Sequence, residues 1–169
     1  AGTGRQPGGG GEAGIGKREG KAAMGDRSKI EWTEATWNPV TGCSPVSEGC
    51  ENCYAKREAE GRLRGRCGYD RDDPFGVTFH PERLGQPSRW SKPRRIFVCS
   101  MGDLFHEDVE DEWLNRVFLE MAVSARHTYI VLTKRPERMR AFVLGKIPFV
   151  KDAGVAGPGL FPHVWLGVT

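Results

Sequence analysis

The sequence predicts an α/β fold in which outer helices cover a parallel sheet. Short apolar runs of strand length alternate along the chain with segments of helical periodicity. The order is loop–helix, strand–helix, strand–helix and strand, and this alternation favours right-handed crossovers between parallel strands. The last run ends at Thr169, where the chain stops. Because (β/α) barrels have about 250 residues, we expect the first part of a barrel, truncated after a strand.

The composition of the chain changes after residue 23. Residues 1–23 are rich in glycine and contain no aromatic residue and no periodic apolar pattern. Such a segment cannot bury enough surface to offset the entropy lost on ordering. We therefore expect a disordered glycine-rich extension or tag over 1–23. The domain then spans 24–169 and forms the N-terminal part of the α/β unit.

The first half of the domain is expected to contain one helix and little strand. Residues 28–32 form a short leading segment that we interpret as a strand. Residues 54–64 are rich in Ala, Glu, Lys and Arg and precede Gly65, which predicts a helix. Three prolines make residues 69–90 irregular, apart from a short strand expected at 77–79.

The second half is expected to contain three strands and two helices. Residues 95–100, Thr128–Thr133 and Val164–Val168 are short apolar runs, which suit adjacent parallel strands buried on both faces. Residues 111–126 place apolar side chains on one helical face. A second helix is expected over 136–144, because proline suits the first helical turn.

Composition excludes several classes of protein. A hydrophobic content of 38% and a charged content of 28% are typical of a globular domain, and no apolar run has the length of a membrane span. The net charge of +3 is too small to indicate nucleic-acid binding by itself. Acidic residues interrupt the basic residues between 56 and 71, so we expect a solvated surface there. The absence of a secretory pattern and the five cysteines, an odd number, predict reduced thiols and a cytoplasmic location.

Three of the cysteines lie in one short loop. Cys43, Cys50 and Cys53 have the spacing C-x6-C-x2-C, and a glycine stands directly before each of the first two. Glycine supplies the unusual backbone angles that a loop needs to direct three sulfurs at one centre. Three thiolates are one ligand short of a closed zinc site or a cubane iron–sulfur site. The missing ligand leaves a position at which a substrate or cofactor can bind.

Two kinds of metal site suit this loop, and the spacing alone does not choose between them. We favour an iron–sulfur cluster. The alternative is a structural zinc site that Cys67, Cys99 or a histidine completes, although no histidine has finger-like spacing from the cysteines. Chance clustering and a disulfide framework are less favoured, because a chain of 169 residues builds a core without disulfides. Otherwise Cys67 and Cys99 are expected to be ordinary residues, with Cys99 buried in its strand.

The cysteine loop resembles that of a known enzyme class. Residues 38–43 (NPVTGC) and 49–55 (GCENCYA) resemble the cluster loop of radical S-adenosylmethionine enzymes related to spore photoproduct lyase. Residues 30–169 as a whole resemble a family of phage and prophage proteins of unknown function with a three-cysteine motif. The shared segments are IEWTEATWNPVTGC, GCENCYA, CSMGDLFHEDV, VLTKRPERM and VWLGVT.

This resemblance implies cofactors and an activity. Cys43, Cys50 and Cys53 would ligate three irons of a [4Fe–4S] cluster, and S-adenosylmethionine would chelate the fourth. An electron donor would reduce the cluster and start radical chemistry on an unknown substrate, for which nucleic acid is one candidate. The fold would be an incomplete radical-SAM-type (β/α) barrel. The loop departs from the usual pattern, because its first gap has three extra residues and its aromatic residue, Tyr54, follows the last cysteine.

Further candidate residues follow the expected strands at their C-terminal ends, where parallel α/β folds place their sites. Ser100 and Asp103 correspond to the segment that contacts the methionine part of the cofactor in radical enzymes, and the alternative is a helix N-cap with its loop. Thr133 and Lys134, at the end of the next strand, are further candidate cofactor-binding residues. Lys134 or Arg135 is a candidate to hold a carboxylate or phosphate, and the alternative is a solvated charge at a helix start.

The remaining polar and aromatic candidates have simpler interpretations. His106, with Glu107 and Asp108, is expected to belong to a polar loop and helix start rather than to a metal site. Trp32 and Trp37 are expected to pack beside the loop rather than to stack on bases. The alternative function for the chain is that of a non-catalytic zinc or iron–sulfur protein with a structural or redox-sensing role.

Overall fold

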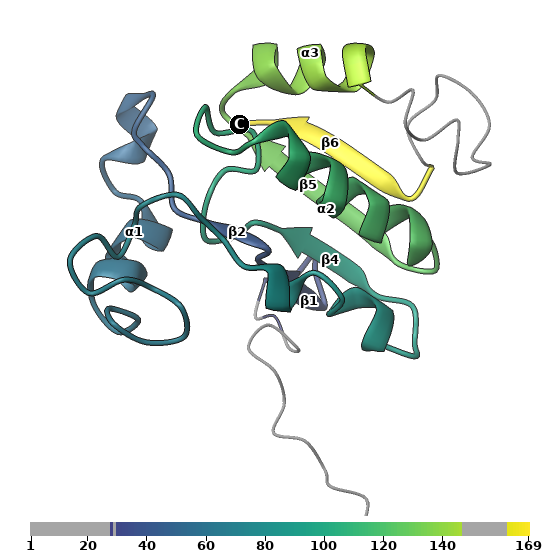
Figure 1. The fold of residues 1–169 in the computed structure, drawn as a ribbon, viewed down its shortest axis with the longest axis horizontal. Coiled ribbons are helices and arrows are strands. Elements are labelled where there is room, and N and C mark those ends of the chain that lie inside the picture. Colours follow the sequence, from purple (N-terminus) through teal and green to yellow (C-terminus); the bar gives the residue numbers. More distant parts are fainter. Residues whose placement is uncertain (1–27, 29, 147–161) are drawn as a thin grey trace, which may run out of the picture.

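A four-stranded parallel sheet with the order β1-β4-β5-β6 forms the centre of the fold (Figure 1). The computed structural model describes residues 28, 30–146 and 162–169. The strands are β1 (Ala35–Trp37), β4 (Arg95–Val98), β5 (Thr128–Thr133) and β6 (Val164–Val168). The predicted α/β class and parallel sheet are confirmed. The described strands form an open sheet, and the extension expected over 1–23 lies outside the described residues.

The prediction of three adjacent parallel strands is confirmed. β4 pairs with β5 and β5 pairs with β6, and β5 and β6 have the predicted bounds. β4 ends at Val98, earlier than predicted, because Cys99 takes a left-handed φ of 55° and turns the chain. The strand expected over 28–32 is wrong, since residues 30–32 form a bend and a turn. The true first strand, β1, is too short to give a period-2 signal.

Three α-helices of the described residues connect these strands and the cysteine loop. They are α1 (Tyr54–Glu60), α2 (Asp111–Val123) and α3 (Pro136–Lys146). α1 is shorter than the helix predicted over 54–64, because Gly61 ends it and donates its N–H to the Arg57 carbonyl. α2 and α3 are confirmed, with ends that differ by a few residues. Neither these helices nor the 3₁₀ turns of the described chain are long and apolar enough to cross a membrane.

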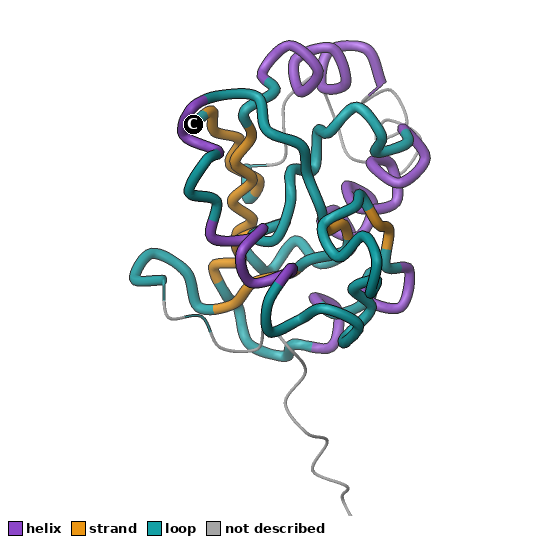
Figure 2. The backbone as a smooth tube through the Cα atoms, turned by 90° about the vertical axis from the view of Figure 1, so that its left-hand side faces the viewer, coloured by secondary structure: helices purple, strands orange, loops and turns teal. Residues whose placement is uncertain are grey.

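A small antiparallel ribbon places the start of the cysteine loop. It pairs β2 (Val40–Thr41) with β3 (Thr78–Phe79), which confirms the strand expected at 77–79. Single 3₁₀ turns lie at Glu48–Cys50, Pro81–Arg83 and Pro87–Arg89. Figure 2 shows that loops make up most of the side of the molecule that carries α1. The cysteine loop therefore begins directly after β2, a short strand that is paired with β3.

The two faces of the sheet are buried to different degrees. One face contributes Trp37, Ile96, Val98, Tyr129 and Val131 to the main core, and all are fully buried. Phe118 of α2 and Phe142 of α3 join this core, with ring centroids 5.2 Å apart. Because side chains alternate along a strand, the residues between them point to the other face. On that second face Phe97, Ile130 and Leu132 are only half-buried.

His80 makes the stability of the fold depend on pH. Its side chain is buried beside β3, and Nε2 lies 2.8 Å from the Thr41 hydroxyl oxygen of β2. Burial, assisted by the nearby Arg83 charge, lowers the pKa of His80 from 6.5 to about 4. Below pH 6.5 the unfolded chain therefore binds a proton that the folded protein excludes, and acid favours unfolding.

We expect the contribution of His80 to the free energy of unfolding to fall by about 2 kcal/mol between pH 7 and pH 5. Urea denaturation at both pH values measures this change. His80→Gln keeps a hydrogen-bonding side chain that does not titrate, so its stability should depend less on pH. An equal pH dependence in the two proteins would contradict the assignment.

Candidate metal centre

The cysteine loop docks on the turn that follows β4. Gly42 continues directly from β2, donates its N–H to the Met101 carbonyl at 2.9 Å and forms an isolated parallel bridge with Gly102. Its φ of 88° is left-handed, so the predicted need for glycine before Cys43 is confirmed. Gly49, before Cys50, is not among the positive-φ residues, and there the expectation of an unusual backbone angle is wrong.

The three loop cysteines lie in different local settings. All are free thiols of intermediate exposure. Cys43 contacts Arg135, Cys50 ends the 3₁₀ turn Glu48–Cys50, and Cys53 directly precedes α1. In the part of the chain that the structure describes, no three His, Cys, Asp or Glu side chains form a group that could hold a metal ion. The sulfurs therefore do not converge in this conformation.

Two of these thiols differ in acidity. Burial raises the pKa of Cys43, and the hydrogen bond from Arg135 offsets only part of this effect. Hydrogen bonds from the backbone of Val46 and the side chain of Ser47 lower the pKa of Cys50, and the charge of Lys134 adds to the shift. At a given pH a larger fraction of Cys50 than of Cys43 is therefore in the thiolate form.

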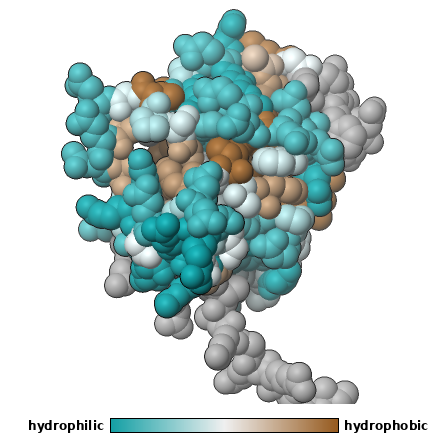
Figure 3. Space-filling model, turned by 60° about the vertical axis from the view of Figure 1, so that its left-hand side comes forward, coloured by the Kyte–Doolittle hydropathy of each residue, from teal (hydrophilic) through white to brown (hydrophobic). Residues whose placement is uncertain are grey.

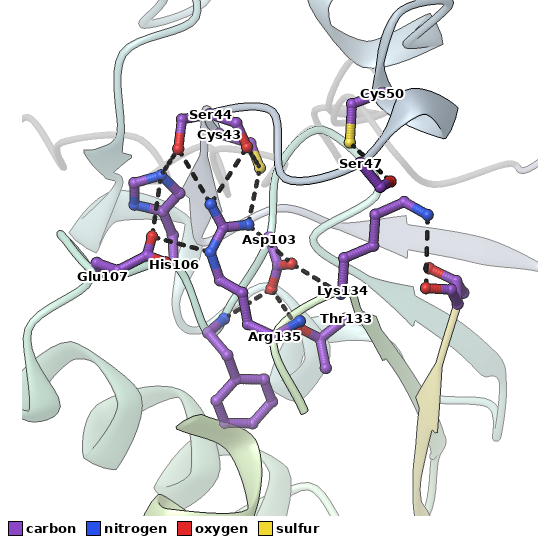
Figure 4. Close-up of polar contacts among 12 residues, drawn as sticks. Cys43, Ser44, Ser47, Cys50, Asp103, His106, Glu107, Thr133, Lys134 and Arg135 are labelled. Atoms are coloured by element: carbon purple, nitrogen blue, oxygen red, sulfur yellow. Dashed lines mark hydrogen bonds and ion pairs between the residues drawn. The ribbon is translucent and has the colours of Figure 1, made fainter. Parts of the chain in front are cut away.

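Asp103 joins the ends of β4 and β5 (Figure 4). One carboxylate oxygen accepts hydrogen bonds from the Thr133 hydroxyl at 2.7 Å and the Phe105 N–H at 3.0 Å. The other accepts from the Lys134 N–H at 3.1 Å and from Arg135 Nη1 at 3.3 Å. Three of the four predicted cofactor-binding residues, Asp103, Thr133 and Lys134, are thus brought together in one network.

Ser100, the fourth predicted cofactor-binding residue, lies outside this network and contacts Asn38 instead. Its hydroxyl donates to the Asn38 side-chain oxygen at 3.1 Å, and the Met101 N–H donates to the same oxygen at 3.0 Å. Neither Ser100 nor Asp103 caps α2, whose N-cap position is Glu110, so the N-cap alternative is wrong. Sequence reasoning missed Asn38 as a link between β1 and this turn, although the motif NPVTGC contains it.

Lys134 extends its side chain toward the cysteine loop (Figure 4). Its Nζ lies 3.4 Å from the Thr169 carbonyl oxygen, and a side chain at Gly49 would begin 3.6 Å from that nitrogen. A positive charge thus faces the segment that holds Cys50. This position suits the predicted role of Lys134 in holding an anion, which stays a prediction.

Arg135 is not the solvated charge that the sequence allowed. Only 6% of its side chain is exposed, and it forms ion pairs with Asp103 and Glu107. The same guanidinium contacts Cys43 and Ser44 of the cysteine loop. The sequence signal was misleading because a charged residue before the helix-starting Pro136 is usually exposed.

His106 fastens the cysteine loop to the segment before α2. The ring is buried, and Nε2 lies 2.7 Å from the Ser44 hydroxyl oxygen. Nδ1 accepts the Asp108 N–H at 3.1 Å, and burial lowers the pKa of His106. The neutral ring therefore carries its proton on Nε2 and donates it to Ser44. Ser44 accepts this hydrogen bond, and His106 lies in the loop before α2 where the sequence placed it.

The tryptophans and the basic segment have packing and surface roles. Trp37 is fully buried in the main core and donates its indole N–H to the Arg83 carbonyl at 2.8 Å. Trp32 packs on Phe97 with centroids 5.0 Å apart. In the basic segment, Arg62 pairs with Glu58 and Lys56 pairs with Glu60 on an exposed surface. Figure 3 shows that this side is mainly hydrophilic, with smaller apolar areas between the polar side chains.

The two remaining cysteines lie outside the loop. Cys99 is buried in the main core as predicted, and burial raises its pKa to about 12. Cys67 is exposed and has a left-handed φ of 53°. We expect Cys67→Ser and Cys99→Ala to bind metal like the unmodified protein, and Cys99→Ala to lose about 1 kcal/mol or more of stability through lost packing. Metal analysis and urea denaturation test both statements, and loss of metal from either folded variant, or full stability of Cys99→Ala, would contradict them.

A family model described as Protein of unknown function (DUF5131) matches residues 27–169. The chain belongs to this family. A search of curated proteins and a search of solved structures found no match. The matched DUF5131 region contains the whole cysteine loop together with Asp103, His106 and Arg135. Because the function of DUF5131 is not known, the family adds no activity to what the site geometry supports.

Proposed function

We propose that this DUF5131 protein is an iron–sulfur protein of the radical S-adenosylmethionine type. Cys43, Cys50 and Cys53 are its three cluster ligands, and S-adenosylmethionine occupies the remaining position. The observation that supports this most is the placement of three free thiols in one loop beside the C-terminal ends of β4 and β5. Parallel α/β proteins bind their ligands at this edge of the sheet.

The three loop thiols are the kind of ligand that a [4Fe–4S] cluster requires. Three thiols share the loop, whereas Cys99 is buried in the core and Cys67 lies in another loop, so one iron is left for a ligand from outside the chain. Binding requires the three sulfurs to move closer together than they are in this conformation. Residues 44–49 are exposed, which leaves room for such a movement. Reduced thiols of this kind belong in a reducing compartment, the cytoplasm.

When bound, the cofactors would supply one-electron chemistry, and residues of the chain would hold and orient them. Lys134 offers a positive charge that offsets the negative charge of thiolates and of a cofactor carboxylate. Ser100 is only half-buried, and it lies in the segment that the resemblance assigns to the methionine part of the cofactor. Asp103 already accepts four hydrogen bonds, so we assign it the role of fixing the strand ends.

We also propose that the sheet belongs to a (β/α) barrel. Phe97, Ile130 and Leu132 form a half-buried apolar face opposite the helices, and such a face points to the interior when a parallel sheet closes. Gly167 of β6 adds to this interpretation, because a Cβ there would lie 2.7 Å from the Leu132 side chain. On the second face of the sheet, the Leu132 side chain therefore already fills the space beside Gly167 of β6.

The activity has a direct test. The protein is reconstituted without oxygen, reduced with dithionite and incubated with S-adenosylmethionine, and the products are separated by chromatography. We expect slow formation of 5′-deoxyadenosine and methionine, because the open iron position lets the cofactor bind before it is reduced. The assay is run with and without single-stranded and duplex DNA, since nucleic acid is one candidate for the unknown substrate.

The same assay distinguishes the proposed activity from the alternative function, that of a non-catalytic iron–sulfur protein. A protein that retains its cluster but forms no 5′-deoxyadenosine under any of these conditions would be a non-catalytic iron–sulfur protein. Ser100→Ala is the informative variant, because it should raise the concentration of S-adenosylmethionine needed without changing the iron content. An unchanged requirement for S-adenosylmethionine would remove Ser100 from the cofactor site.

A further inference from the structure

Arg135 connects the cysteine loop to the end of the sheet through a single buried side chain (Figure 4). Its Nη1 lies 3.4 Å from the Cys43 sulfur and 3.3 Å from Asp103 Oδ2. Its Nη2 donates to the Ser44 carbonyl oxygen at 3.2 Å and to the Ser44 hydroxyl at 3.1 Å. Nε donates to a Glu107 carboxylate oxygen at 2.9 Å. All three guanidinium nitrogens are therefore used.

The orientation of this guanidinium is fixed from the side of the sheet. The Arg135 N–H donates to the Thr133 hydroxyl at 2.9 Å, and that hydroxyl donates to Asp103 at 2.7 Å. Asp103 in turn holds one guanidinium nitrogen in the interior. A planar guanidinium that is held in this way directs Nη1 and Nη2 at the loop segment formed by Cys43 and Ser44, while its Nε donates to Glu107.

Arg135 makes more contacts than a buried ion pair needs in order to be satisfied. A buried Arg–Asp pair needs only the carboxylate to satisfy it, and such pairs contribute little net stability. Here Arg135 contacts Cys43 at its sulfur and Ser44 at both the backbone and the side chain. Cys43 and Arg135 are 92 residues apart in the sequence, so this contact is made only by the folded chain.

We infer that Arg135 is the positioning residue of the cysteine loop. It fixes Cys43 against the end of β5 and donates an N–H to the sulfur that serves as a cluster ligand. The second part rests on the proposed function. A positive charge and a hydrogen bond at a ligand sulfur stabilise the reduced, more negative cluster, so Arg135 raises the reduction potential.

The test compares Arg135→Lys with Arg140→Lys. Lysine at 135 keeps the charge beside Asp103 but cannot reach Cys43 and Ser44 together, whereas Arg135→Ala would leave Asp103 unpaired in the interior. Arg140 is an exposed residue of α3, so its replacement by lysine is the matched control. Amide hydrogen exchange is measured on each purified protein, and the midpoint potential is measured by electron paramagnetic resonance on each iron-loaded protein.

We expect at least tenfold faster exchange in the peptide spanning residues 42–50 of Arg135→Lys, with no change in Thr128–Thr133. The reduction equilibrium of the iron-loaded variant should fall about tenfold, which is about 59 mV for one electron. Arg140→Lys should match the unmodified protein in both measurements. A purely structural role for Arg135 would leave the potential unchanged.

Two results would overturn the inference. One is unchanged exchange in residues 42–50 of Arg135→Lys, whether or not the protein binds iron. The other is an unchanged midpoint potential in an Arg135→Lys protein with a full complement of iron. If the unmodified protein retains no iron, the proposed function fails instead. In that case, the exchange measurement alone decides whether Arg135 positions the loop.

Discussion

We expect each of the variants Cys43→Ala, Cys50→Ala and Cys53→Ala to lose its bound iron. The proposed site has three protein ligands, all in one loop, and the other cysteines lie in the core and in a separate exposed loop. Removal of one thiolate leaves two, which is half of the usual ligand number of a cubane cluster. Anaerobic reconstitution should therefore give a brown protein with a broad charge-transfer band only when all three thiols are present.

Cys67→Ser is the matched control for these variants. It removes a thiol that is exposed and lies outside the loop, so the brown colour and the iron content should be retained. Loss of iron from Cys67→Ser would identify a fourth protein ligand. That result would close the site and contradict the open position on which S-adenosylmethionine binding depends.

Gly42→Ala causes the largest loss of stability that we expect from a single methyl group. A Cβ at this position would overlap the carbonyl group of Gly76 and lie 2.7 Å from the Phe75 carbonyl oxygen, both of which are backbone. The φ of 88° adds a further cost for any residue with a side chain. Together these effects should lower the free energy of unfolding by more than about 3 kcal/mol.

Gly85→Ala provides the comparison for Gly42→Ala. A Cβ at Gly85 meets no atom within 4 Å, so its effect on stability should stay within about 1 kcal/mol. Urea denaturation of the two variants measures the difference directly. Equal stabilities would show that the close approach of Gly42 to the backbone of Phe75 and Gly76 is not needed for folding.

The fold was predictable where the signal is local and long enough. Thr128–Thr133 and Val164–Val168 are continuous apolar runs, and the structure has both as strands with those bounds. β1 was missed because three residues are too few for an alternating pattern. The helix predicted over 54–64 is too long, because residues that favour helix continue past Gly61 although α1 ends there.

The site was predictable only in outline. The rule that parallel α/β folds bind ligands at the C-terminal ends of strands placed Asp103 and Thr133 correctly beside each other. The contacts of Arg135 and His106 with Ser44 could not be inferred, because the partners are 91 and 62 residues apart. Nothing in the local sequence of a charged residue before a proline signals that its side chain will be buried against a distant loop.

The metal and sulfide content of the protein, prepared without oxygen, tests the central proposal most directly. We predict iron and inorganic sulfide in equal amounts and an electron paramagnetic resonance signal of the reduced protein that changes when S-adenosylmethionine is added. This change is expected because one iron of the proposed cluster would have no cysteine ligand and would be free to bind the cofactor. Stoichiometric zinc with no retained iron would contradict the proposal and favour a structural metal site.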